Sequence, residues 1–240
     1  MSPPEPISDE LRRWFEQRLR DAKLDAMKEL AYGASHEINN PLANIALRAQ
    51  TLLKREDDPD KRKALEAMHR AAMRAHEMIS DLMLFARPPE PQRQAIDLLE
   101  VARSVVEGQG PLADERGVLL EVTEDSTPAP AWADRDQLIV ALRAVVQNSL
   151  DATEGEGAVL VRVCATGDAG LITVEDDGQG VPDEVLPHVF DPFFSGREAG
   201  RGLGFGLTKC WRIVTLHGGD VLLENRPEGG VRVVMSLPLA

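Results

Sequence analysis

The sequence is poor in aromatic residues and in positive charge. Phe, Trp and Tyr make up 4% of the 240 residues, so the chain offers few rings on which nucleic-acid bases could stack. It carries 27 Lys and Arg against 40 Asp and Glu, a net charge of −13, which disfavours binding to nucleic acid or to an anionic membrane surface. We therefore expect no nucleic-acid partner.

Long apolar runs and paired cysteines are also missing. No run reaches the roughly 18 apolar residues that a membrane-spanning helix needs. The start of the chain is proline-rich and acidic, whereas a signal peptide begins basic and continues apolar. Cys164 and Cys210 lie far apart without metal-ligand spacing, which is typical of reduced thiols. These features predict a cytoplasmic protein with no membrane span in this chain.

Charge divides the chain near residue 95. Residues 1–95 contain 16 basic and 16 acidic side chains, whereas residues 96–240 contain 11 and 24. The division coincides with the proline-rich stretch 87–91, which cannot continue a helix because proline lacks the amide donor. We predict a helical lead-in over 1–30, a helical hairpin over 31–91 and a second domain over 92–240.

The first part has the hydrophobic period of packed helices. Apolar residues recur at alternating steps of three and four over 38–52 and again over 65–86, with a polar break at 55–60. This pattern predicts two helices in an antiparallel hairpin. A lone hairpin leaves half of its apolar stripe in water, so we expect two copies to form a homodimeric four-helix bundle.

The second part mixes helical and strand-like patterns. Helices are expected over 97–116, 134–153 and 206–217. Strands are expected over 118–122, 158–165, 171–175, 220–224 and 231–237, with a hairpin turn at 166–170. The predicted fold class is α+β, with helices on one face of a mixed sheet.

His36 and Glu37 lie where polar residues interrupt the apolar pattern of the first helix. The pattern places His36 beside the apolar seam, facing outward. A neighbouring carboxylate can hold the proton on one ring nitrogen while the other keeps a lone pair for nucleophilic attack. Pro41 loosens this position because it removes the amide that would bond to the Glu37 carbonyl. The alternative is an ordinary surface histidine on a kinked helix.

Two glycine clusters mark the second domain. Residues 176–180 follow an expected strand, and residues 200–207 precede an expected helix. Closely spaced glycines let backbone amides approach phosphate oxygens, and the N-terminus of a helix favours negative charge. Asn148, on the expected helix 134–153, offers an amide oxygen that can coordinate Mg²⁺ without adding charge. The alternatives are ordinary turns and an ordinary polar helix face.

Residues 36–42 resemble the phosphoacceptor box of sensor histidine kinases. Downstream, residues 147–152 resemble the asparagine box of this family, 176–180 its first glycine box, 190–194 its phenylalanine box and 202–207 its second glycine box, in the family's order. The resemblance implies a dimeric helical bundle with the reactive histidine, followed by a Bergerat-type α/β sandwich that binds ATP.

The resemblance also implies a two-component phosphotransfer. His36 would take the γ-phosphoryl group of ATP, with Glu37 as its proton acceptor, and would pass it to an aspartate of a response-regulator receiver domain. Asn40 would match the polar residue that orients water to dephosphorylate that partner. No sensor or receiver domain is recognised in this chain, so either the input comes from another protein or this sequence is a fragment of a larger sensor.

In the second domain the resemblance assigns a nucleotide site. Asn148 would hold Mg²⁺, Asp176 would accept a hydrogen bond from the adenine amino group, and Arg197 would lie near the γ-phosphate. Residues from about 181 to 205 would form a lid over ATP. The other residues expected to bind the nucleotide are Asp151, Gly178, Gly180, Phe193, Gly202, Gly204 and Gly206.

Two other functions remain as alternatives. One is a degenerate kinase-like scaffold that dimerises and binds nucleotide without phosphotransfer, which autophosphorylation of the purified protein would exclude. The other is a coiled-coil adaptor joined to an unrelated enzyme domain, which requires the absence of ATP binding. Ala144 stands four residues before Asn148, where gyrase-like relatives carry the glutamate that activates water, and this argues against a free ATP hydrolase.

Overall fold

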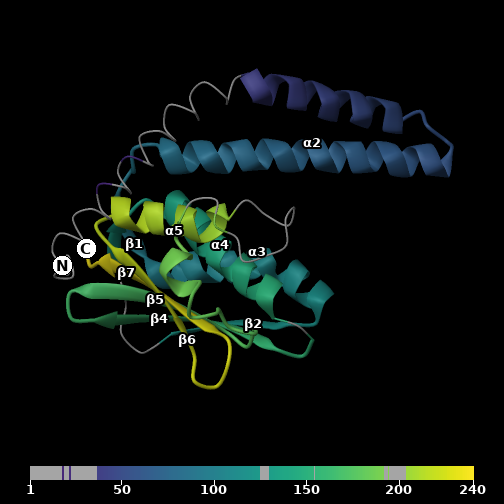
Figure 1. Cartoon of the computed structure of the whole chain (residues 1–240). Coiled ribbons are helices and arrows are strands. Elements are labelled where there is room, and N and C mark those ends of the chain that lie inside the picture. The colour runs from purple at the N-terminus through teal and green to yellow at the C-terminus, as the bar shows by residue number, and fades with distance from the viewer. Residues whose placement is uncertain are drawn as a thin grey trace, which may run out of the picture. The chain divides into compact units, whose positions relative to one another are not determined.

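The computed structural model describes residues 18, 22, 37–124, 130–153, 155–191, 194 and 204–240. The chain divides into two compact units, Met1–Pro88 and Pro89–Ala240. The first contains a pair of long helices, and the second a layer of helices on a sheet (Figure 1). No helix among the described residues is long and apolar enough to cross a lipid bilayer.

The first unit is a helical hairpin. A helix over 37–53 is followed by a short turn and by α2 (Pro59–Ala86). Asp58 caps α2, because its side chain accepts from the backbone N–H groups of Asp60 and Lys61. Pro59 occupies the first helical turn, where its missing amide donor costs nothing. The polar break thus ends one helix and begins the next.

Cross-helix hydrogen bonds fix the register of this hairpin. They join His76 Nδ1 to Asn39 Oδ1 (3.0 Å), His69 Nδ1 to the Ala46 carbonyl oxygen (3.2 Å) and Arg62 Nη1 to the Leu53 carbonyl oxygen (2.9 Å). Each step of seven residues along one helix is matched by a step of seven back along the other. The two helices are therefore antiparallel and keep the heptad period of the sequence.

The hairpin leaves an apolar stripe in solvent. The seam residues Ile38, Ile45 and Leu52, spaced by seven, are 41%, 49% and 57% exposed. Ala46 and Ala49, on the neighbouring side of the same helix, are buried. Small residues therefore lie at the contact between the two helices, while the large apolar residues at positions 38, 45 and 52 remain largely uncovered in a single chain.

The second unit is built on a five-stranded mixed sheet with the order β2-β4-β5-β7-β6. Its strands are β2 (Leu119–Glu124), β4 (Ala158–Thr166), β5 (Ala169–Asp176), β6 (Asp220–Asn225) and β7 (Val231–Pro238). β2 and β4 are parallel, and the other pairs are antiparallel. Gly167, with a φ of 59°, lies in the turn between β4 and β5, whose last ladder pair is Thr166 with Ala169.

Three helices cover one face of this sheet (Figure 1). They are α3 (Leu98–Arg116), α4 (Arg135–Ala152) and α5 (Phe205–Leu216). Burial alternates along β5 and β7, so every second side chain of these strands belongs to the core. The fully buried side chains include Leu138, Leu142, Ile172, Ile213 and Met235. The predicted α+β class, with helices on one face of a mixed sheet, is confirmed.

Some elements of the second unit differ from the sequence prediction. β1 (Gln94–Asp97) and β3 (Pro130–Ala133) pair in a separate two-stranded sheet, and a short 3₁₀ helix covers Leu186–His188. Strands of four residues are too short to show an alternating pattern, because they depend on pairing with a distant partner. Pro111 lies inside α3 without ending it, and the helix ends at Gly117 in the left-handed conformation.

Candidate functional site

Asn148 lies near the C-terminal end of α4. The helix begins at Asp134, whose side chain caps the N–H groups of Asp136 and Gln137. A Cβ atom added at Gly206, in the first turn of α5, would lie 3.0 Å from Asn148 Nδ2 and 3.3 Å from Asn148 Oδ1. The missing side chain therefore lets the start of α5 approach the Asn148 amide, which brings the asparagine box and the second glycine box together.

Asp151 is one turn further along α4 and is held by an ion pair. Arg116, the last residue of α3, places Nη2 2.5 Å from Asp151 Oδ1. Gln147 Nε2 donates to the same carboxylate oxygen at 3.0 Å. The charge of Asp151 is thus compensated by a neighbouring helix.

Asp176 ends β5 as a buried carboxylate, 3% exposed. Its Oδ1 atom accepts from the backbone N–H groups of Gly178 at 3.0 Å and of Val231 at 3.1 Å. A Cβ atom at Gly178 would lie 2.9 Å from the Ala152 carbonyl oxygen, so only glycine lets this loop lie against the last turn of α4. Gly180 has a φ of 77°, which glycine adopts without strain.

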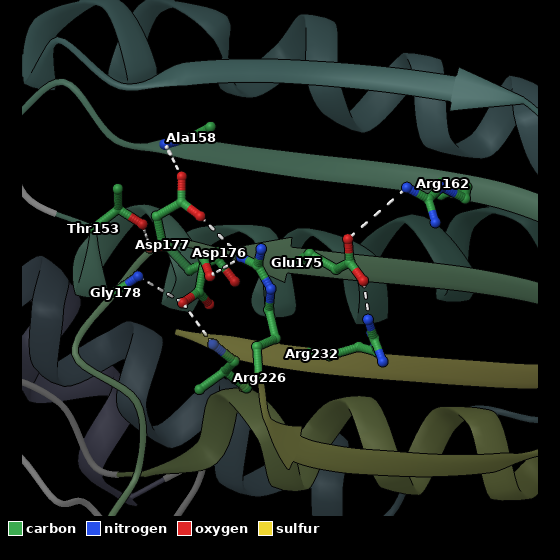
Figure 2. A network of polar contacts seen from close by, with 11 residues as sticks. Thr153, Ala158, Arg162, Glu175, Asp176, Asp177, Gly178, Arg226 and Arg232 are labelled. Atoms are coloured by element: carbon green, nitrogen blue, oxygen red, sulfur yellow. Dashed lines mark hydrogen bonds and ion pairs between the residues drawn. The ribbon is translucent and has the colours of Figure 1, made fainter. Parts of the chain in front are cut away.

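The next carboxylate, Asp177, links three segments (Figure 2). Its Oδ2 atom accepts from the N–H of Ala158 at 3.0 Å, at the start of β4. Its Oδ1 atom accepts from Arg226 Nη1 at 2.9 Å, just after β6. The sequence interpretation missed Arg226, because no local motif marks it and its partners lie about 50 positions earlier in the chain.

The phenylalanine box packs at the start of α5. The Thr208 hydroxyl donates to the Asp191 carbonyl oxygen at 3.2 Å, and His188 Nδ1 lies 3.0 Å from Asp191 Oδ2. Gly204 precedes α5 with a φ of 71°, and a Cβ atom there would lie 1.9 Å from the Phe194 carbonyl oxygen. The predicted site residues Phe193, Arg197 and Gly202 lie outside the described residues.

In the helical unit, the predicted acceptor His36 also lies outside the described residues. Glu37 and Asn40 lie on the first helix and are exposed. Asn44 Nδ2 donates to the Asn40 carbonyl oxygen at 3.0 Å, within the helix. In the described parts of both units, no three His, Cys, Asp or Glu side chains gather into a group that could hold a metal ion.

Three segments that are distant in the chain thus meet at the C-terminal end of α4. They are the asparagine box of α4, the loop after β5 and the glycines that begin α5. Backbone amides at a glycine-rich helix start, an amide oxygen and a buried carboxylate are the groups that bind phosphate, metal and base of a nucleotide. The fold and this site define a nucleotide-binding α/β sandwich that follows a helical hairpin.

Comparison with known proteins identifies both units. The family "Histidine kinase-, DNA gyrase B-, and HSP90-like ATPase" matches residues 133–240. The family "His Kinase A (phospho-acceptor) domain" matches residues 26–91. The phosphoacceptor match contains the predicted acceptor His36, and the ATPase match contains both glycine boxes.

Individual proteins that are similar to this chain point to the same family. The sensor histidine kinase ZraS of Klebsiella oxytoca is 32% identical over 93% of this chain and 48% of that protein. The C4-dicarboxylate transport sensor protein DctS of Rhodobacter capsulatus is 33% identical over 93% of this chain and 35% of that protein. The crystal structure of full-length ShkA in complex with AMPPNP matches with a TM-score of 0.78 and 25% identity, over 88% of this chain and 46% of that one.

The chain belongs to the sensor histidine kinases, with a phosphoacceptor domain followed by an ATP-binding domain. It spans about half the length, or less, of these relatives.

Proposed function

We propose that this chain is an ATP-dependent protein-histidine autokinase. The γ-phosphoryl group of ATP passes to a ring nitrogen of His36 as the bond to the departing ADP breaks, and Glu37 takes the ring proton. The phosphoryl group then moves to an aspartate of a response-regulator receiver domain. The observation that carries this proposal is the contact of Gly206 and Asn148, which joins the asparagine box to the second glycine box.

The buried carboxylate of Asp176 suits recognition of adenine. Two backbone N–H groups occupy Oδ1 and fix the orientation of the carboxylate. Among the described residues, no hydrogen bond reaches Oδ2, and this oxygen is the acceptor that we assign to the adenine amino group. A charged acceptor gains roughly 1.5–3 kcal/mol from such a hydrogen bond.

The acidic charge of the chain is compensated locally around the site. Asp151 is paired with Arg116, and Asp177 with Arg226. ATP is itself highly anionic, so these two ion pairs lower the repulsion that the net charge of −13 would otherwise impose.

Mg²⁺ fits the residues that are present. Magnesium normally binds through one or two protein oxygens together with phosphate oxygens and water, and Asn148 offers one neutral amide oxygen. When bound, the ion would neutralise phosphate charge. Glycine amides at the start of α5 would hold the phosphates, and catalysis would come mainly from positioning of His36 and the γ-phosphorus. We also place the reaction in the cytoplasm, where thiols such as those of Cys164 and Cys210 stay reduced.

We further propose that the protein works as a homodimer. The exposed seam of Ile38, Ile45 and Leu52 offers an apolar stripe that a second hairpin would cover. A receiver domain is the partner that the acceptor chemistry requires, and the histidine kinase ThkA, similar in fold with a TM-score of 0.68, has been crystallised with the response regulator TrrA. We assign Asn40, which is exposed on the same helix, the role of orienting water for dephosphorylation of that partner.

Autophosphorylation tests the proposal. Purified protein incubated with γ-labelled Mg-ATP should gain a label that is acid-labile and alkali-stable. His36→Gln should abolish this label. His69→Gln, a control on α2 whose amide can still donate to the Ala46 carbonyl oxygen, should retain it. Label on His36→Gln protein would refute the acceptor assignment. Absence of label on the unmodified protein, with ATP bound, would favour the nucleotide-binding scaffold.

A further inference from the structure

The β6–β7 hairpin forms hydrogen bonds to loop 176–181, which begins with Asp176. Arg226 Nη1 donates to the Asp176 carbonyl oxygen at 2.6 Å and to Asp177 Oδ1 at 2.9 Å. The Arg226 side chain is only 17% exposed, so water competes weakly for these hydrogen bonds. Figure 2 shows the guanidinium beside Asp176 and Asp177, with the Asp177 carboxylate between it and Ala158.

The preceding residue holds the other end of the same loop. Asn225 Oδ1 accepts from the Val181 N–H at 2.8 Å, and Asn225 Nδ2 donates to the Val181 carbonyl oxygen at 2.7 Å. A side-chain amide that satisfies both backbone groups of one residue replaces a strand neighbour. Two consecutive residues of the hairpin therefore fix loop 176–181 at its beginning and at its end.

These hydrogen bonds also influence the orientation of the Asp176 carboxylate. One of the two donors to Asp176 Oδ1 is the N–H of Val231, which belongs to the same hairpin. The approach is close, since a Cβ atom at Gly230 would lie 1.8 Å from the Asp176 carbonyl oxygen. Any shift between loop and hairpin would move one donor relative to the other and rotate the carboxylate.

We propose that Arg226, together with Asn225, is a positioning residue for adenine recognition. It holds Asp176 so that Oδ2 faces the purine amino group, and it thereby sets the preference for ATP over GTP, whose purine has a carbonyl oxygen at that position. A carboxylate oxygen attracts the amino group of adenine and repels the carbonyl oxygen of guanine only when it points at that position of the purine. The inference rests on the proposed nucleotide site.

Arg232 provides a matched control. It also forms ion pairs from the same strand pair, with Nε 2.6 Å from Glu175 Oε1 and Nη1 3.0 Å from Glu224 Oε1. Glu175 (Figure 2) lies on β5 and Glu224 on β6, both outside loop 176–181. Arg232→Met therefore removes ion pairs of the same kind without removing any of the hydrogen bonds described for loop 176–181.

The experiment measures Kd for Mg-ATP and Mg-GTP by calorimetry, and Tm, for the full chain. Arg226→Met should weaken ATP binding about tenfold and GTP binding less than twofold, so the ATP preference falls. Arg226→Lys should recover part of it. Arg232→Met should lower Tm and leave both Kd values within twofold. Asn225→Ala, at an exposed position, should lower the ATP preference in the same direction and serves if Arg226→Met does not fold.

Different outcomes test the positioning role of Arg226 and the proposed nucleotide site separately. A lower Tm for Arg226→Met with an unchanged ATP to GTP ratio would assign Arg226 a purely structural role and overturn the inference. If Arg226→Met does not fold, an unchanged ATP to GTP ratio in Asn225→Ala would do the same. Failure of the unmodified protein to bind Mg-ATP would instead overturn the proposed function on which the inference depends.

Discussion

Replacing Asp176 separates its role in the fold from the role in nucleotide binding that we propose for it. In Asp176→Asn the amide oxygen can take the place of Oδ1 and keep the hydrogen bonds from Gly178 and Val231. The amide NH₂ then occupies the place of Oδ2 and points a donor at the adenine amino group. We expect Tm to stay within about 2 °C of the unmodified protein, because every buried backbone donor keeps an acceptor.

The cost in binding can be estimated from the lost acceptor. A hydrogen bond to a charged group contributes roughly 1.5–3 kcal/mol, so Kd for Mg-ATP should rise about 10- to 150-fold in calorimetric titration. By contrast, Asp176→Ala leaves the buried Val231 N–H without an acceptor. A cost of about 2–3 kcal/mol would lower the Tm of this unit by roughly 5–10 °C.

Measurements on the two Asp176 variants can refute this assignment of Oδ1 and Oδ2. If Asp176→Asn bound Mg-ATP with the Kd of the unmodified protein, Oδ2 would not face the base. If Asp176→Asn lost as much Tm as Asp176→Ala, the two backbone hydrogen bonds would depend on charge and the geometric argument would fail.

Four further predictions concern other parts of the chain. Gly206→Val should displace the Asn148 amide and weaken Mg-ATP binding about tenfold by calorimetry; unchanged Kd would show that the contact is unimportant. Burial raises the pKa of Cys210 to about 12, so a thiol reagent at pH 8 should label only Cys164 until the protein is denatured. The unfolded Cys210 thiol ionises near its ordinary value of 9.0 while the folded thiol stays protonated, so urea titrations should show stability falling from about pH 9 towards 12. Ile45→Glu, at an exposed seam position, should keep helical content and yield monomers in light scattering; a persistent dimer would exclude this stripe as the interface.

Local patterns were sufficient for the longer helices and for the strands of the main sheet. The three-four spacing predicted both helices of the hairpin, and short runs rich in strand-forming residues predicted all five strands of the main sheet. These patterns arise from side chains a few residues apart, which one face of a helix or strand must bury. The short strands β1 and β3 were missed, because each is stabilised mainly by the other across about 35 residues.

The apolar stripe of the first helix shows a second limit of prediction from local sequence patterns. The same heptad includes Ala49, which is buried in the hairpin, and Ile45, which is half exposed. Both positions are apolar at the spacing of packed helices, so periodicity alone could not tell which contacts lie within one chain. Only the cross-helix register, set by pairs such as His69 with Ala46, divides the stripe.

The sequence by itself determined the fold class, the order of the motifs and the chemistry of Asn148 and Asp176, because residue type and spacing are local properties. The tertiary structure decided what surrounds those groups. Pairing of β5 with β7 in one register places Glu175 opposite Arg232, and this brings Val231 and Arg226 to the loop that contains Asp176. A slip of one residue would turn each side chain to the opposite face, so these contacts depend on the sheet as a whole.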